Sequence, residues 1–144
     1  MNIEVSGAST LDEAIVEHIA EAVIFANREG IIERWNTASE QMFGFSAAEA
    51  IGQTLDLMIP EHLRAAHWRG FDAAMNNGEL RLNGRATLTR GLHKSGRKLY
   101  VEMSFALVRD AGAAVLGSVA VARDVSERVE REKAARAAAN ATGK

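Results

Sequence analysis

Three consecutive runs of strand character occupy the second half of the sequence and limit the folds available to it. They cover residues 84–93, 97–109 and 113–123. The middle run alternates apolar and polar residues, which is typical of a strand with one buried face. Short turn signals at residues 94–96 and 110–112 separate the runs. Because loops this short join antiparallel neighbours, we expect three long strands of one antiparallel sheet.

The first half of the chain adds two shorter strands and several helices. Ala22–Asn27 and Ile31–Trp35 flank the turn signal Arg28-Glu29-Gly30, which predicts a hairpin. Capping residues followed by helical spacing predict helices over residues 10–20, 37–43 and 60–76, a short helix after Ser46, and a charged, alanine-rich helix over 125–139. The predicted fold class is therefore α+β. It has a five-stranded antiparallel sheet, a helical insert on one face, and flanking N- and C-terminal helices.

Length and composition narrow the function. The chain has 144 residues, a formal net charge of −2 and no cysteine. This length fits one domain. The charge argues against broad binding to nucleic acid or anionic membranes. Without cysteine there is no disulfide, thiolate zinc site or thiol nucleophile, and a cytoplasmic location is the simplest interpretation. No enzyme motif such as a P-loop or G-x-S-x-G is present, so we do not expect an enzyme.

Three segments resemble the PAS family of sensor domains. They are AVIFANREGIIERWNTASEQMFGFSAAEAIGQ, HKSGRKLYVEMSFALVRD and GSVAVARDVSE. The resemblance covers about residues 11–128, with Ser95 in place of the usual Asp and Ser126 in place of Thr. It implies a sensor whose sheet and helices enclose a pocket for heme, flavin, a small metabolite or nothing. It also implies a division into a flexible arm (1–9), a sensor domain (10–124), and a signalling helix with tail (125–144).

The long predicted helix places one histidine on an apolar face. At helical spacing Leu63, His67, Gly70 and Phe71 share one side of the helix. Ala66 and Gly70 leave little side chain beside the imidazole. Such a histidine suits an axial ligand to a flat, apolar macrocycle. The plainer interpretation is a histidine hydrogen-bonded at the edge of an ordinary core.

The same helix resembles the heme-binding PAS domains of oxygen-sensing histidine kinases. Within the string IPEHLRAAH, the residues Pro60, Glu61, Arg64 and His67 match in register. The resemblance places His67 on the proximal ligand of heme b and Thr87 where those kinases carry a distal arginine. A flavin photoadduct or a thioester-linked chromophore is excluded, because both need a cysteine.

We expect further cofactor contacts from the strands and from the residues before the helix. Alternation along the predicted strand at residues 97–109 turns Val101, Met103 and Phe105 inward. The resemblance places Ala120, a small residue of the last strand, where it leaves room over a metal. The predicted cofactor-binding set is His67, Leu63, Gly70, Phe71, Met58, Val101, Met103, Phe105 and Ala120. Oxygen, carbon monoxide, nitric oxide and redox state all stay open as the signal.

Two hypotheses follow from the sequence. In the first, the chain is a heme-based PAS sensor that signals through its C-terminal helix to a partner protein. In the second, it is a heme-free PAS module for dimerisation, partner binding or sensing of a small organic ligand. Both predict a homodimer through the helices at residues 10–20 and 125–139, and neither predicts binding to nucleic acid or a membrane.

Overall fold

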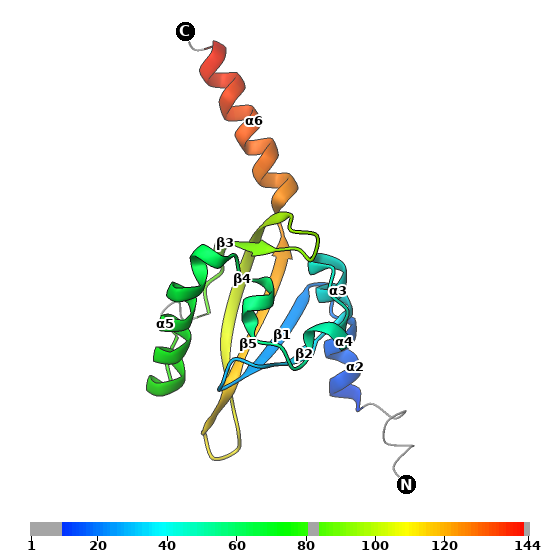
Figure 1. The fold of residues 1–144 in the computed structure, drawn as a ribbon, viewed down its shortest axis with the longest axis vertical. Helices are drawn as coiled ribbons and strands as arrows, with labels where there is room; N and C mark the ends of the chain where they lie inside the picture. The colour runs from blue at the N-terminus through cyan, green and yellow to red at the C-terminus, as the bar shows by residue number, and fades with distance from the viewer. Residues whose placement is uncertain (1–9, 81–83, 143–144) are drawn as a thin grey trace.

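Five strands form one antiparallel sheet in the order β2-β1-β5-β4-β3, as the sequence predicts. A computed structural model describes residues 10–80 and 84–142, so the predicted arm at residues 1–9 lies outside the described residues. Figure 1 shows the elements, which are α2 (Leu11–His18), β1 (Ala22–Asn27), β2 (Ile32–Trp35), α3 (Thr37–Phe43), α4 (Ala47–Ala50), the 3-10 helix η1 (Leu55–Met58), α5 (Glu61–Asn77), β3 (Thr87–Leu92), β4 (Lys98–Arg109), β5 (Val115–Asp124) and α6 (Ser126–Thr142).

The first and last strands lie side by side in the middle of the sheet. β1 pairs with β5 along its whole length, and β5 pairs in turn with β4. Ile24 of β1 and Phe105 of β4 both lie opposite Ala120 of β5. Residues opposite each other in neighbouring strands point to the same face. One row on the inner face therefore contains residues from three strands that are far apart in the sequence.

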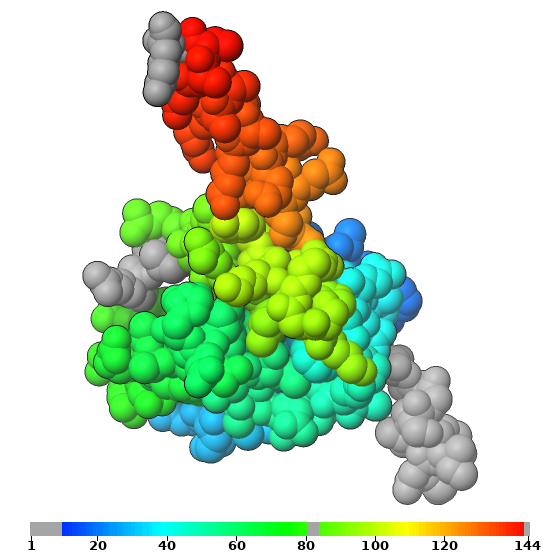
Figure 2. Space-filling model, turned by 45° about the horizontal axis from the view of Figure 1, so that its top comes forward, coloured from blue at the N-terminus to red at the C-terminus, as the bar shows by residue number. Residues whose placement is uncertain are grey.

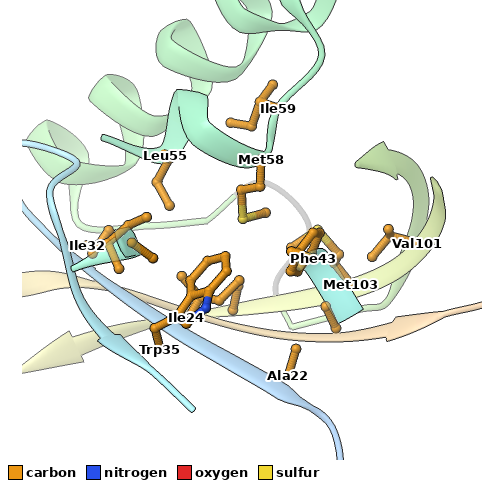
Figure 3. Packing of buried hydrophobic residues seen from close by; sticks show 14 of the residues in the cluster. Ala22, Ile24, Ile32, Trp35, Phe43, Leu55, Met58, Ile59, Val101 and Met103 are labelled. Atoms are coloured by element: carbon orange, nitrogen blue, oxygen red, sulfur yellow. The ribbon is translucent and has the colours of Figure 1, made fainter. Parts of the chain in front are cut away.

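The hydrophobic core fills the space between the sheet and the helical insert. Leu55 and Met58 of η1 point toward the strands that carry Ile24 and Met103 (Figure 3). Ile24 is 1% exposed and Met103 is 5% exposed. Burying a side chain of this size stabilises the fold by about 1.5–3 kcal/mol. The core therefore fixes η1 and the start of α5 over the inner face of the sheet.

Most of the predicted element ends agree with the structure, and the differences have local causes. The capping boxes at Thr10 and Ser46 are both formed. The sequence predicts that Pro60 is the first residue of the long helix, whereas in the structure Pro60 is the N-cap and α5 begins at Glu61. The 3-10 helix η1 was not predicted, because four residues are too few to show a period. β3 begins at Thr87 instead of residue 84, and α6 continues to Thr142 instead of residue 139.

Asn36 joins the helical insert to the first strand through its buried side chain. Its Oδ1 accepts hydrogen bonds from the backbone N–H groups of Val23 (2.9 Å) and Ser39 (3.0 Å), and the second of these caps α3. Its Nδ2 donates to the carbonyl oxygens of Val16 (2.9 Å) and Glu21 (3.1 Å). The side chain thus satisfies backbone groups of α2, β1 and α3 and of the segment between α2 and β1, in a residue that is 1% exposed.

Replacing Asn36 with alanine should lower the free energy of unfolding by about 3 kcal/mol. The change removes a helix cap, worth about 0.5–2 kcal/mol, and leaves buried backbone groups unpaired at about 1–3 kcal/mol each. Urea denaturation of the full chain measures this loss. The control is Asn140→Ala on the exposed face of α6, which should change stability by less than about 0.5 kcal/mol. A loss below 1 kcal/mol for Asn36→Ala would contradict this role.

The C-terminal helix α6 projects from the sheet end of the molecule. Figures 1 and 2 show it standing clear of the other elements. Val125 and Val129 are 6% and 8% exposed, whereas every described residue after Val129 is exposed. Only the first turn is therefore anchored in the core.

Candidate functional site

A cavity of about 400 Å³ lies between α5, η1 and the inner face of the sheet. This volume falls within the range of about 300–1,000 Å³ that is typical of small-molecule sites. Nearly all of its lining is apolar, and the polar side chains are few. The lining residues are Ile24, Ala26, Leu55, Met58, Ile59, Leu63, Ala66, His67, Gly70, Phe71, Ala74, Met75, Leu80, Thr89, Arg90, Met103, Phe105, Ser118 and Ala120.

The structure brings eight of the nine predicted site residues together at this cavity. They are Met58 from η1, Leu63, His67, Gly70 and Phe71 from α5, Met103 and Phe105 from β4, and Ala120 from β5. Val101 is not at the cavity. It is fully buried, and its Cγ2 lies 3.1 Å from where a Cβ on Gly91 would stand. Alternation correctly predicts that Val101 faces inward, but it does not show that Val101 lies beside Gly91 of β3 in the packed core instead of at the cavity.

Apart from Ala120, the part of the wall formed by the central strands β1 and β5 was not predicted from the sequence. Ile24, Ala26 and Ser118 line the cavity. They share the inner face because Ile24 lies opposite Ala120 and Ala26 lies opposite Ser118 in the β1–β5 pair. Alternation within each strand was the available signal. It becomes useful only once the pairing of the first strand with the last strand is known.

His67 carries a buried nitrogen without a partner. Its Nδ1 has no hydrogen-bond partner within the described residues, although the atom is shielded from solvent. Burial lowers the pKa of His67 below its ordinary value of 6.5, and the carboxylates of Asp56 and Asp72 oppose this effect. The ring is therefore mainly neutral at pH 7, which is the protonation state in which imidazole binds a metal ion. The plainer interpretation, a hydrogen-bonded core histidine, does not account for the unpaired Nδ1.

Two aromatic rings hold the imidazole on the cavity wall. The Trp68 ring lies 4.8 Å from the His67 ring at an interplanar angle of 75°, and the Phe71 ring lies 5.9 Å away at 33°. One helical turn further on, a Cβ added to Gly70 would meet nothing within 4 Å. Open space therefore lies along α5 beside the imidazole.

The basic residues near the cavity are engaged elsewhere. Arg64 donates from Nε to the carbonyl oxygen of Ile59 (2.9 Å) and from Nη2 to that of Asp56 (3.2 Å). Arg90 belongs to the lining, but its guanidinium lies over the ring of Tyr100, 5.2 Å from the centroid. Thr87, the residue counted to the place of a distal arginine, is not at the cavity.

The described residues contain neither a cluster of metal-binding side chains nor a helix that could span a membrane. Across residues 10–80 and 84–142, no group of three or more His, Asp or Glu side chains gathers to hold a metal ion. In the same ranges, no helix has the length and apolar character needed to cross a membrane.

Comparison with known proteins agrees with the fold. A family model described as PAS fold matches residues 10–125. The sensor protein FixL of Bradyrhizobium diazoefficiens is 27% identical over 99 residues, which are 69% of this chain and 20% of that protein. The oxygen sensor protein DosP of Escherichia coli is 27% identical over 121 residues, which are 83% of this chain and 15% of that protein. The crystal structure of a PAS domain from Colwellia psychrerythraea matches with a TM-score of 0.67 at 22% identity, covering 81% of this chain and 95% of that one.

A five-stranded sheet with a helical insert over a central cavity is the architecture of a sensor domain. The chain belongs to the PAS family. It spans no more than about a fifth of the length of these two curated relatives.

The pKa of His67 gives a prediction with a definite sign. Because the folded pKa lies below the unfolded value of 6.5, the folded protein binds fewer protons than the unfolded chain just below that pH. The contribution of His67 to stability is therefore complete above pH 6.5 and is lost as the pH falls toward the folded pKa. In cofactor-free protein, the free energy of unfolding of wild type should therefore fall relative to that of His67→Gln as the pH is lowered over this range. NMR titration of the His67 ring at or above pH 6.5 would contradict the prediction.

Proposed function

We propose that this PAS domain binds heme b, with His67 as the proximal iron ligand, and senses a diatomic gas or a redox state. The observation that carries the proposal is the unpaired, buried Nδ1 of His67 on the wall of an apolar cavity. A buried polar nitrogen without a partner costs about 1–3 kcal/mol, so its presence needs an explanation. A neutral imidazole in this setting is suited to bind iron.

The cavity lining fits a flat, mainly apolar group. Open space beside Gly70 extends along α5 next to the imidazole, and Phe71, Met103 and Phe105 stand at the wall without closing the cavity. Met58, Leu63, Gly70, Phe71, Met103, Phe105 and Ala120 would contact the macrocycle. When bound, heme supplies an iron that takes up a gas molecule or changes its oxidation state. Oxygen, carbon monoxide, nitric oxide and redox state are equally compatible with these lining residues as the signal.

Contacts at the end of the sheet support signalling through α6. The backbone N–H of Tyr100 on β4 donates to Ser126 Oγ (2.9 Å), and its carbonyl oxygen accepts from the N–H of Val125 (2.9 Å). Lys133 donates to the Tyr100 hydroxyl (2.5 Å). A shift of β4 at the cavity would therefore move the base of α6. We accordingly assign sensing to residues 10–124 and output to residues 125–144.

Hemin titration of the purified full chain tests the proposal. We expect a Soret band that differs from that of free hemin and saturates at one hemin per chain. His67→Ala should weaken hemin binding by more than about tenfold, which corresponds to about 1.4 kcal/mol. The matched control is His62→Ala, because His62 lies exposed on the same helix and outside the cavity lining.

Two outcomes would contradict heme binding. One is the absence of a Soret change with wild-type protein, and the other is a Soret change that His67→Ala leaves intact. Either would favour the second function, a heme-free PAS module that binds a partner or a small organic ligand in the same cavity.

We also propose a homodimer that uses α2, independently of the cofactor. Leu11, Ile15 and Ile19 follow one another at four-residue spacing and are 74%, 52% and 38% exposed. Leu11 and Ile15 form an apolar stripe on α2, which has no buried residue, and Ile19 follows as its C-cap residue. A second copy of the chain would cover this stripe. The charged helix α6 offers a second contact to that copy or to a signalling partner.

Ile15→Asp should weaken self-association by about tenfold or more. The change places a charge in the proposed interface and removes the burial of an isoleucine, worth about 1.5–3 kcal/mol. Sedimentation velocity across a range of protein concentrations measures the dimer Kd. Ile51→Asp is the control, because Ile51 is 46% exposed and lies outside α2. Equal dimerisation of wild type and Ile15→Asp would exclude this interface.

A further inference from the structure

Trp68 is fixed by a hydrogen bond to η1. Its Nε1 donates to Asp56 Oδ1 at 2.8 Å. Asp56 is in turn tied to α5, since Arg64 donates to its carbonyl oxygen (3.2 Å) and has its Nε 3.9 Å from its carboxylate. The indole therefore has a defined position relative to both η1 and α5.

The far side of the indole rests on the turn between β1 and β2. A Cβ added to Gly30 would lie 2.3 Å from Trp68 Cη2 and 2.4 Å from Cζ3, so only glycine leaves room for the ring. Gly30 has φ +79°, a value that also favours glycine. Its carbonyl oxygen accepts from the N–H of Leu55 (3.2 Å), which joins the turn to η1.

The same indole contacts the proposed iron ligand. The Trp68 ring lies 4.8 Å from the His67 ring and 5.4 Å from the Phe71 ring. Metal-binding histidines are usually oriented by a hydrogen bond to the ring nitrogen that does not bind the metal. Neither ring nitrogen of His67 makes a hydrogen bond within the described residues, so contacts with neighbouring rings hold the imidazole.

We infer that Trp68 is a positioning residue for His67, held by the Asp56 carboxylate and the Gly30 backbone. The role of His67 as an iron ligand rests on the proposed function, whereas the orientation of its ring does not. Trp68 replaces the usual hydrogen bond with a fixed aromatic contact. The ring orientation of His67 therefore depends on the hydrogen bond from Trp68 to Asp56, in which His67 takes no part.

NMR of cofactor-free full-length protein with isotopically labelled histidine tests this inference. Trp68→Phe, which removes the indole N–H, and Asp56→Ala, which removes its acceptor, should both move the His67 ring resonances toward those of an unrestrained imidazole. Asp56→Asn keeps an oxygen acceptor and should restore the wild-type resonances. Trp35→Phe is the matched control, because the Trp35 Nε1 also donates a hydrogen bond, in its case to the carbonyl oxygen of Phe45 (2.9 Å), but Trp35 does not line the cavity.

A second readout uses hemin. Trp68→Phe and Asp56→Ala should release hemin about 10 times faster than wild type, as is typical when the support of a metal ligand is removed. Asp56→Asn and Trp35→Phe should release it at the wild-type rate.

The two readouts separate failure of this inference from failure of the proposed function. If wild-type protein binds no hemin, heme binding is wrong, and the NMR comparison still decides the role of Trp68. If Trp68→Phe and Asp56→Ala change the His67 resonances no more than Trp35→Phe does, Trp68 is an ordinary packing residue and the inference is overturned.

Discussion

The pairing of β1 with β5 is the constraint on which the rest of the structure depends. It joins residues about a hundred positions apart, such as Ala22 and Ala122, so that the whole helical insert lies in the chain between two adjacent strands. Because the insert lies between these strands in the sequence, its helices must return across one face of the sheet. Asn36 secures that return, since its side chain bonds backbone groups before, within and after β1. The position of α5 follows from this arrangement.

The cavity is a consequence of small residues on the two central strands. On the inner face, Ala22 lies opposite Ala122, Ile24 opposite Ala120, and Ala26 opposite Ser118. Ala26, Ser118 and Ala120 contribute only short side chains to the cavity wall, and Gly70 adds none from α5. Larger residues of η1 and β4, such as Met58 and Phe105, form other parts of the wall. Protein interiors are normally filled, so a cavity of about 400 Å³ is consistent with a ligand site.

The surroundings of His67 combine a stability cost with precise placement. Burial keeps its ring neutral, the unpaired Nδ1 costs free energy, and the neighbouring rings hold the imidazole in position. Such a combination is typical of a group kept for binding instead of stability. From this wall, β4 runs to Tyr100, where backbone and side-chain hydrogen bonds meet the base of α6. The fold thus offers a short path from the cavity to the helix that leaves the domain.

The sequence by itself determined the elements and one side of the site. Alternation gave the strands, capping residues gave most helix ends, and helical spacing placed His67 on an apolar face, because these signals act within a few residues. The tertiary structure alone decided that Ile24, Ala26 and Ser118 line the cavity, that Val101 lies in the packed core beside Gly91, and that Trp68 rests on Gly30. These facts arise from contacts between distant segments. Local periodicity shows which face a residue occupies, but not which other segment covers it.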